Sequence, residues 1–309
     1  MAQFVNLISK PDDDVDPFSS APAETGEEST DVVALKAAPV EEVDIQMGCR
    51  LVVYTDPRGP AAERFRYLRI RLREPWETGK LKTVLITSAL PQDGKTTIAV
   101  NLASSLSEHG KKRVLLIEAD LHRPSLALQL GLKPGPGLVE CLGSDVNPIP
   151  LIRRLEPLGW YLLKAGGKCI NPTELLQAGA LPGLLERLSP HFDWILIDSP
   201  PVIPVTDALA MAREVDAILM VVRAGSTPRE AVQRSLAQLG RRKLLAVVLN
   251  AMEDLNLIYS KYGYYNKTLT DGGASTVADD GPDASNNAGQ SNSGERSRFN
   301  PLGIHKKKK

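Results

Sequence analysis

The middle of the chain alternates short apolar runs with segments of helical periodicity. The apolar runs are continuous blocks of Val, Ile and Leu, a pattern typical of strands that are buried on both faces. These runs lie at residues 83–87, 113–119, 160–165, 194–199, 217–222 and 244–250. Segments in which apolar residues recur every three to four positions separate most of them, at residues 95–108, 181–190, 205–213 and 228–240.

This alternation predicts the class of fold. Strands that alternate with helices form βαβ units with right-handed crossovers. We therefore expect an α/β fold of three layers, in which a mostly parallel central sheet carries helices on both faces. Ligands of such sheets bind at the carboxyl ends of the strands. The residues that follow each predicted strand are thus the first candidates for chemistry.

Both ends of the chain lack these patterns. Residues 1–45 carry eleven acidic residues against two lysines, and the residues from 268 onward have many Gly, Ser, Asn and Asp and no periodicity. Segments of such composition bury too little apolar surface to offset the entropy of ordering them. The sequence predicts a disordered acidic segment at 1–46, a folded domain at 47–267 and a disordered tail at 268–309.

Composition narrows the class of protein further. The 309 residues have a formal net charge of zero, which argues against a general nucleic-acid binder. The three cysteines match no zinc pattern and form no even set of disulfides. No secretory signal opens the chain, and no run approaches the ~20 apolar residues of a membrane span. We expect a cytoplasmic protein whose link to a membrane, if it has one, comes through a partner.

The segment SALPQDGKTT, residues 88–97, joins the first predicted strand to a predicted helix. Gly94 lets the backbone approach a phosphate, while successive N–H groups and the start of the helix donate hydrogen bonds. Lys95 can reach the outer phosphate oxygens, and the Thr96 hydroxyl can bind Mg²⁺. Position 89, where the general pattern has glycine, is alanine. The predicted nucleotide-binding residues are Pro91, Gln92, Asp93, Gly94, Lys95, Thr96 and Thr97.

Acidic residues follow two further strands. Asp198 ends an apolar strand in the pattern of a magnesium carboxylate. Asp120 is expected to hold the water shell of the magnesium ion or to accept a proton from an attacking hydroxyl. Glu118 lies two residues before Asp120, so both carboxylates are expected to point toward the phosphate side. The alternative for either acid is a turn or helix-capping role; His122 is expected to be a loop residue, and Asp207 a cap or first-turn acid.

These motifs together resemble one family. SALPQDGKTT, VLLIEADLHRPS, WILIDSPPV and VVRAGSTPREAV are similar to segments of the bacterial tyrosine kinases of capsular and exopolysaccharide synthesis, a branch of the P-loop ATPases related to MinD and ParA. That branch typically has S-x-x-P-x-x-G-K-[ST] at its first loop, which fits Ala89 and Pro91. Asp198 and the following prolines match its D-x-P-P motif. Glu118 departs from the family, which usually has aspartate there. The resemblance covers about residues 55–255.

The resemblance implies an activity and its cofactors. It implies a P-loop NTPase fold and a protein-tyrosine kinase that uses ATP and Mg²⁺ to phosphorylate C-terminal tyrosines of a neighbouring copy. Lys95, Asp120 and Asp198 would be the catalytic residues, and Thr96, Asp120 and Asp198 the residues at the metal. The family packs subunits into a ring through E-x-x-R-x-x-R, which Glu63, Arg66 and Arg69 match. The alternative for this helix is a solvated basic face.

Four of the seven tyrosines fall within seven positions after the last predicted strand. As phospho-acceptors they would accumulate about −1.5 to −2 charges each, which could loosen an oligomer by repulsion. The alternative is that they pack on the last strand. In the family such a cluster commonly lies near the very C-terminus, whereas 44 residues follow this one. The predicted acceptors are Tyr259, Tyr262, Tyr264 and Tyr265.

The resemblance also implies partners. They are a transmembrane polysaccharide co-polymerase that activates the kinase and recruits it to the inner face of the plasma membrane, further copies of the chain, and a tyrosine phosphatase. Two alternatives remain open at this point. One is a MinD/ParA-like ATPase switch, although such switches usually carry K-G-G-x-G-K, and residues 88–92 contain no lysine. The other is a scaffold whose nucleotide only sets its oligomeric state.

Overall fold

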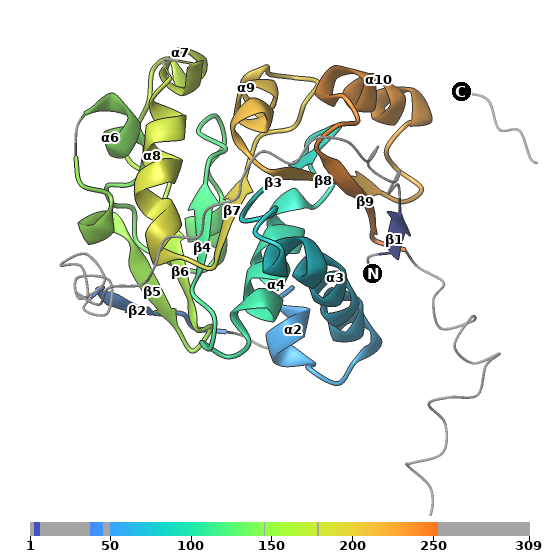
Figure 1. Cartoon of the computed structure of the whole chain (residues 1–309), viewed down its shortest axis with the longest axis horizontal. Coiled ribbons are helices and arrows are strands. Elements are labelled where there is room, and N and C mark those ends of the chain that lie inside the picture. Colours follow the sequence, from blue (N-terminus) through green and yellow to red (C-terminus); the bar gives the residue numbers. More distant parts are fainter. Residues whose placement is uncertain (1–2, 7–37, 46–49, 145, 178, 253–309) are drawn as a thin grey trace, which may run out of the picture. The chain divides into compact units, whose positions relative to one another are not determined.

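The computed structural model describes residues 3–6, 38–45, 50–144, 146–177 and 179–252 (Figure 1). The four predicted acceptor tyrosines at 259–265 lie outside these ranges. Among the described residues, no helix has both the length and the apolar character that crossing a membrane requires.

The described strands form one sheet of nine members in the order β1-β9-β8-β3-β7-β4-β6-β5-β2. Six strands match the six predicted apolar runs. The strands are β1 (Gln3–Asn6), β2 (Val40–Glu42), β3 (Thr83–Ser88), β4 (Val114–Glu118), β5 (Arg153–Glu156), β6 (Trp160–Leu163), β7 (Trp194–Asp198), β8 (Ala217–Arg223) and β9 (Leu244–Asn250).

Pairing in the sheet is parallel except at β1 with β9 and at β5 with β6. The centre is wholly parallel: β3 lies between β7 and β8, and β7 lies between β3 and β4. Since parallel strands of one sheet end at the same edge, the segments that follow β3, β4 and β7 meet there. The predicted three-layer α/β fold is confirmed.

The helices follow the predicted segments closely, with short additional ones between them. They are α2 (Val52–Thr55), α3 (Pro60–Glu77), α4 (Lys95–Ser107), α5 (Leu126–Gln129), α6 (Leu138–Gly143), α7 (Pro172–Gln177), α8 (Ala180–Leu188), α9 (Asp207–Glu214) and α10 (Arg229–Leu239), with two 3₁₀ turns at Ile149–Leu151 and Ser189–His191.

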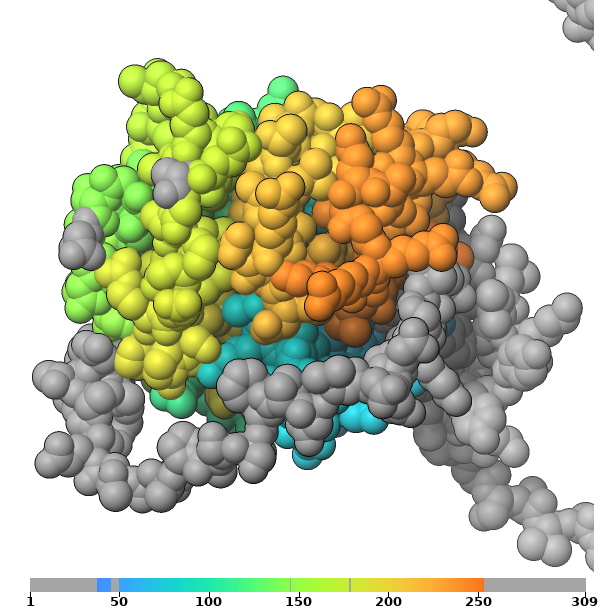
Figure 2. Space-filling view, turned by 45° about the horizontal axis from the view of Figure 1, so that its top comes forward, coloured from blue at the N-terminus to red at the C-terminus, as the bar shows by residue number. Residues whose placement is uncertain are grey.

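Two hydrophobic cores lie on opposite faces of the sheet, because successive side chains of a strand point to opposite faces. In β3, Val84 and Ile86 join one core, while Leu85 joins the other. Helices α2, α3 and α4 cover the first core, and α6, α8, α9 and α10 cover the second (Figure 1). Figure 2 shows α8, α9 and α10 in sequence across their face, from yellow-green through gold to orange.

The prediction of disorder for residues 1–46 is wrong for two short segments. Residues 3–6 form β1 on the edge of β9, and residues 40–42 form β2 on the edge of β5. An edge strand offers unpaired N–H and C=O groups, and a short segment of almost any composition can satisfy them. Because this pairing uses only backbone groups, it requires no pattern of apolar residues by which the sequence would predict the strand.

An ion pair adds to the attachment of β2. Glu41 Oε1 lies 2.7 Å from Nζ of Lys164 and 3.4 Å from Nε of Arg153. The Lys164 ammonium is nearly buried and also donates to the carbonyl of Lys133 at 2.9 Å. A buried ammonium needs a counter-charge. Glu41 therefore ties β2 to the end of β6.

Replacing Glu41 with alanine should lower the free energy of unfolding by about 1–3 kcal/mol, between the values typical of exposed and of buried ion pairs. The reason is that Lys164 would stay buried without its carboxylate partner. Urea unfolding followed by circular dichroism measures the change. Glu42→Ala is the matched control: Glu42 is the exposed neighbour on β2, and its removal should change stability by less than about 0.5 kcal/mol. Equal effects would contradict the role of the ion pair.

Candidate functional site

The loop between β3 and α4 has two residues with left-handed backbone angles. Gln92 has φ of 67° and Gly94 has φ of 97°. A Cβ atom on Gly94 would lie 2.0 Å from the side-chain nitrogen of Asn250, closer than any contact allows. Glycine is therefore required at position 94 both by its backbone angle and by the close approach of Asn250.

Residues distant in sequence form hydrogen bonds that hold the loop between β3 and α4 in place. The carboxylate of Asp93 is almost fully buried, and it accepts hydrogen bonds from the Thr227 hydroxyl at 2.7 Å and from the backbone N–H of Leu90 at 3.1 Å. The side chain of Asn250 donates to the carbonyl of Asp93 at 2.9 Å. Burial raises the pKa of Asp93, while the bonds from Thr227 and Leu90 act in the opposite direction. This carboxylate shapes the loop.

The alanine at position 89 has a structural explanation. Ala89 is fully buried and belongs to the core beneath α8 and α9. Its carbonyl accepts a hydrogen bond from the N–H of Ile203 at 3.3 Å. The side chain points into the core, so this loop does not need a glycine at its first position.

A cleft of about 1000 Å³ opens above the loop. It is lined by all seven predicted nucleotide-binding residues and by Asp120. The remaining lining residues come from the segments after β4 and β7, from the end of β8 and the turn after it, and from a position two residues before α2. They are His122, Arg123, Ser125, Gln129, Pro200, Pro201, Pro204, Val205, Arg223, Ser226 and Arg50.

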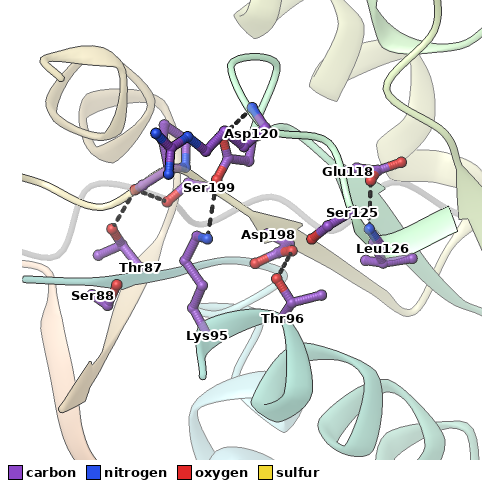
Figure 3. Close-up of polar contacts among 12 residues, drawn as sticks. Thr87, Ser88, Lys95, Thr96, Glu118, Asp120, Ser125, Leu126, Asp198 and Ser199 are labelled. Atoms are coloured by element: carbon purple, nitrogen blue, oxygen red, sulfur yellow. Dashed lines mark hydrogen bonds and ion pairs between the residues drawn. The ribbon is translucent and has the colours of Figure 1, made fainter. Parts of the chain in front are cut away.

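Four of the predicted site residues form two pairs beside the cleft, which Figure 3 shows side by side. Nζ of Lys95 lies 3.0 Å from Oδ2 of Asp120. The Thr96 hydroxyl donates to Oδ2 of Asp198 at 2.7 Å. The strand order explains this meeting, because Asp198 ends β7, between the loop after β3 and the acid after β4.

Asp198 fits a cation ligand by its surroundings. Its side chain is almost fully buried, and among the described residues its second oxygen, Oδ1, has no hydrogen-bond partner. Burial raises the pKa of Asp198 to about 7, and Asp120 and Glu118 act in the same direction, whereas Lys95 and Thr96 oppose them. A divalent cation next to the carboxylate would favour its charged form. The orphaned oxygen beside the Thr96 hydroxyl therefore suits Mg²⁺.

The expectation that Glu118 points toward the phosphates with Asp120 is wrong. Oε1 of Glu118 accepts the backbone N–H of Leu126 at 2.6 Å, and Oε2 accepts that of Ala165 at 3.2 Å. Figure 3 shows Glu118 beside Leu126, apart from Lys95. Strand β4 ends at Glu118, so the two-residue periodicity that relates side chains on one face does not extend to Asp120. Glu118 holds the start of α5 and the segment that follows β6.

The sequence did not reveal that His122 and Asp207 form a pair. Nε2 of His122 lies 2.9 Å from Oδ2 of Asp207, and the Thr173 hydroxyl donates to Oδ1 of Asp207 at 2.7 Å. Asp207 is the first residue of α9, as expected, but it is fully buried. The one signal in the sequence is that His122 lies two residues after Asp120.

The residues predicted for oligomer contacts lie on α3. Glu63 and Arg66 form an ion pair with each other, and Arg66 also donates to the carbonyl of Pro57. Arg69 donates to the carbonyl of Ser105 at 3.2 Å. All three side chains retain exposed surface, from 31% for Arg69 to 55% for Glu63. They are therefore accessible from one side of α3 within the described part of the chain.

A phosphate-binding loop that joins a buried strand to a helix, together with two acidic residues at the ends of adjacent strands, is typical of the P-loop nucleotide-binding enzymes.

No protein-family model matches the chain. The chain is 29% identical over 222 residues to the tyrosine-protein kinase YwqD of Bacillus subtilis, which covers 71% of this chain and 92% of that protein. It is 35% identical over 204 residues to the succinoglycan biosynthesis transport protein ExoP of Rhizobium meliloti, 64% of this chain but only 26% of ExoP.

Structural comparison agrees with the sequence comparison. The kinase domain of the Escherichia coli tyrosine kinase ETK superposes with a TM-score of 0.63 at 26% identity, over 69% of this chain and 84% of that domain. In both sequence and fold, the chain is thus similar to bacterial tyrosine kinases. The resemblance inferred from the motifs is confirmed.

Gly94→Ala should abolish tight binding of ATP, because the new methyl group would push Asn250 away and distort the loop. Gly79→Ala is the matched control: Gly79 also has a positive φ, of 70°, but a Cβ there meets no atom within 4 Å. Each substitution should cost about 1–2 kcal/mol of stability through its backbone angle. Only Gly94→Ala should also lose affinity for a fluorescent ATP analogue, measured with excess Mg²⁺. Unchanged affinity in Gly94→Ala would contradict the assigned loop geometry.

Proposed function

We propose that this chain is an ATP-dependent tyrosine autokinase that phosphorylates tyrosines of a neighbouring copy. The observation that carries the proposal is the pairing of Lys95 with Asp120 and of Thr96 with Asp198 at the edge of one cleft. These pairs supply a cation for phosphate, a hydroxyl and carboxylate for Mg²⁺, and a second carboxylate for the acceptor. Phosphoryl transfer needs mainly positioning and charge neutralisation, so no His or Cys nucleophile is required.

The phosphates of ATP would lie against the N–H groups of the loop and the start of α4. Thr96 and Asp198 would hold Mg²⁺, which neutralises charge that develops on the phosphate oxygens. Lys95 would leave Asp120 for a phosphate oxygen, and Asp120 would then be free to accept a hydrogen bond from the tyrosine hydroxyl. As the tyrosine oxygen bonds to the γ-phosphorus, the bond to ADP breaks and the phenolic proton passes to Asp120.

The acceptors that we propose are Tyr259, Tyr262, Tyr264 and Tyr265, presented by one copy to the cleft of the next. They lie outside the described residues, so the proposal rests on their clustering in the sequence. Each phosphate adds about −1.5 to −2 charges near pH 7. Several on one segment would repel one another and weaken the contacts between copies.

The relatives also bear on the choice of partner. The chain spans 92% of YwqD but about a quarter of ExoP, which is a transport protein of succinoglycan biosynthesis. We propose that this kinase acts with a transmembrane polysaccharide co-polymerase, which would recruit it to the inner face of the plasma membrane. The pathway would be the polymerisation and export of a capsule or exopolysaccharide, with a tyrosine phosphatase to reverse the modification.

The comparisons favour the kinase over both alternatives. The relatives named above are a tyrosine kinase, a polysaccharide transport protein and a tyrosine kinase domain. An ATPase switch or a scaffold would not require the tyrosine cluster. The distinction remains experimental, because all three would bind ATP.

Incubation of the purified full-length chain with ATP and Mg²⁺ should produce phosphotyrosine, and Lys95→Ala should reduce its rate by about 100-fold or more, as the loss of a transition-state cation does in other enzymes. Immunoblotting and mass spectrometry provide the measurement. A chain with all four clustered tyrosines changed to Phe should hydrolyse ATP but acquire no label.

Each negative result has a separate meaning. ATP hydrolysis without phosphotyrosine in the unmodified chain would refute the kinase and support the switch. Label that persists in the four-tyrosine variant would leave the kinase intact and refute the acceptor assignment.

We further propose that Glu63, Arg66 and Arg69 join copies into a ring. Replacing Arg66 with alanine should shift the chain from oligomer to monomer in size-exclusion chromatography with light scattering, since an exposed cation at the interface is lost. Arg73→Ala is the matched control, because Arg73 is also exposed and paired within α3, to Glu77 at 2.6 Å. The same oligomeric state in both variants would argue against the proposed interface.

A further inference from the structure

His122 is a residue of the cleft wall that the proposed chemistry leaves without a role. It follows Asp120 by two residues, in the loop between β4 and α5, and it lines the cleft. Its side chain is one-third exposed, and one ring nitrogen, Nε2, is bound to Asp207 at 2.9 Å. The imidazole is thus fixed at one end and open to the cleft along part of its surface.

The surroundings of Asp207 determine the tautomer of this imidazole. Asp207 is fully buried, and its two oxygens receive the Thr173 hydroxyl and the His122 ring. An ionised carboxylate can only accept hydrogen bonds, so we assign the proton of the neutral ring to Nε2. The other nitrogen, Nδ1, then carries a lone pair. Among the described residues Nδ1 has no hydrogen-bond partner.

The lone pair on Nδ1 of His122 determines which groups can form a hydrogen bond with this nitrogen. Phosphate oxygens only accept hydrogen bonds, so they would not pair with Nδ1 of the neutral ring. A peptide N–H is a donor that every acceptor segment carries. Positions 120 and 122 are at most about 7 Å apart along the chain, comparable to the length of a tyrosine side chain. A tyrosine whose hydroxyl meets Asp120 can thus have its backbone near His122.

We propose that His122, held by Asp207 and Thr173, is a positioning residue for the acceptor, whose Nδ1 accepts a hydrogen bond from the backbone N–H beside the tyrosine. The inference rests on the proposed kinase function and specifies how the same cleft receives its second substrate. Recognition through the backbone tolerates different neighbours. It therefore suits a segment in which four tyrosines with different flanking residues must use one site in turn.

The test measures transfer between two full-length forms of the chain. The acceptor form carries Lys95→Ala and all its tyrosines; the enzyme form carries the four Tyr→Phe changes, so only the acceptor is labelled. In the enzyme form, His122→Gln keeps a side-chain N–H near the position of Nε2 and loses the acceptor at Nδ1. We expect the KM for the acceptor form to rise about two- to tenfold, as the loss of one neutral hydrogen bond predicts, with kcat and affinity for ATP within about twofold.

A second variant, Asp207→Asn, removes the lone pair on Nδ1 of His122 without changing His122 itself. Asp207→Asn can donate its amide N–H to Nε2, which moves the ring proton to Nδ1 and removes the lone pair; an Asp-to-Asn change beside a catalytic histidine is known to act through the tautomer. It should raise the acceptor KM like His122→Gln. His109→Gln, at an exposed histidine in the turn after α4, should leave KM unchanged. Thermal melting of each variant identifies any loss of folding.

The possible outcomes test the role of His122 separately from the proposed kinase function. An unchanged acceptor KM in a folded His122→Gln enzyme would overturn the inference and leave the kinase standing. A loss of ATP affinity without a change in acceptor KM would also overturn it, and would make His122 a phosphate contact. No transfer with the His122-intact enzyme form would overturn the proposed function and this inference with it.

Discussion

The parallel pairing of β7 with both β3 and β4 is the constraint on which the site depends. Asp198 stands in register with Ile86 of β3 on one side and Glu118 of β4 on the other. The carboxyl ends of these strands therefore meet, and three segments far apart in sequence place Lys95, Thr96, Asp120 and Asp198 together. The two cores keep this register, because a slip of one residue would turn every buried side chain of a strand to the opposite face.

Within that frame, buried polar groups serve two different purposes. Asp93, Glu118 and Asp207 each have both carboxylate oxygens satisfied by donors from the protein, and they hold loops and helices in place. Asp198 is as deeply buried but keeps one oxygen without a partner among the described residues. Burial of an unsatisfied carboxylate is costly. Glu41 also has an oxygen without a hydrogen-bond partner among the described residues, but its side chain is only partly buried and its other oxygen pairs with Lys164. The deep burial of Asp198 and its position beside the Thr96 hydroxyl therefore make it the acid best suited to a partner from outside the chain.

The sequence predicted the central strands and the long helices because their apolar periodicity is strong. It did not predict β5, whose residues RRLE are mostly polar, or β1 and β2, which are held by backbone pairing at edges. The motifs predicted Lys95, Thr96, Asp120 and Asp198 as neighbours, since loop chemistry and strand ends are local features. Thr227 and Asn250, which support Asp93, could not be found in this way, because their contacts span more than 130 residues.

Within the six residues from Glu118 to Arg123, some side chains hold the loop in place and others face the proposed reaction. This arrangement affects how the kinase can select its acceptor. Glu118 fixes its beginning, the N–H of Arg123 donates to Asp120 at 3.1 Å, and Asp207 holds His122. A loop fixed at three points cannot remodel its hydrogen bonds for each substrate. An acceptor segment must instead fit groups that are already in place, and the group shared by every such segment is its backbone. A cleft with a rigid wall thus selects a tyrosine by its accessibility and not by its flanking sequence. A cluster of closely spaced acceptors requires this kind of selection.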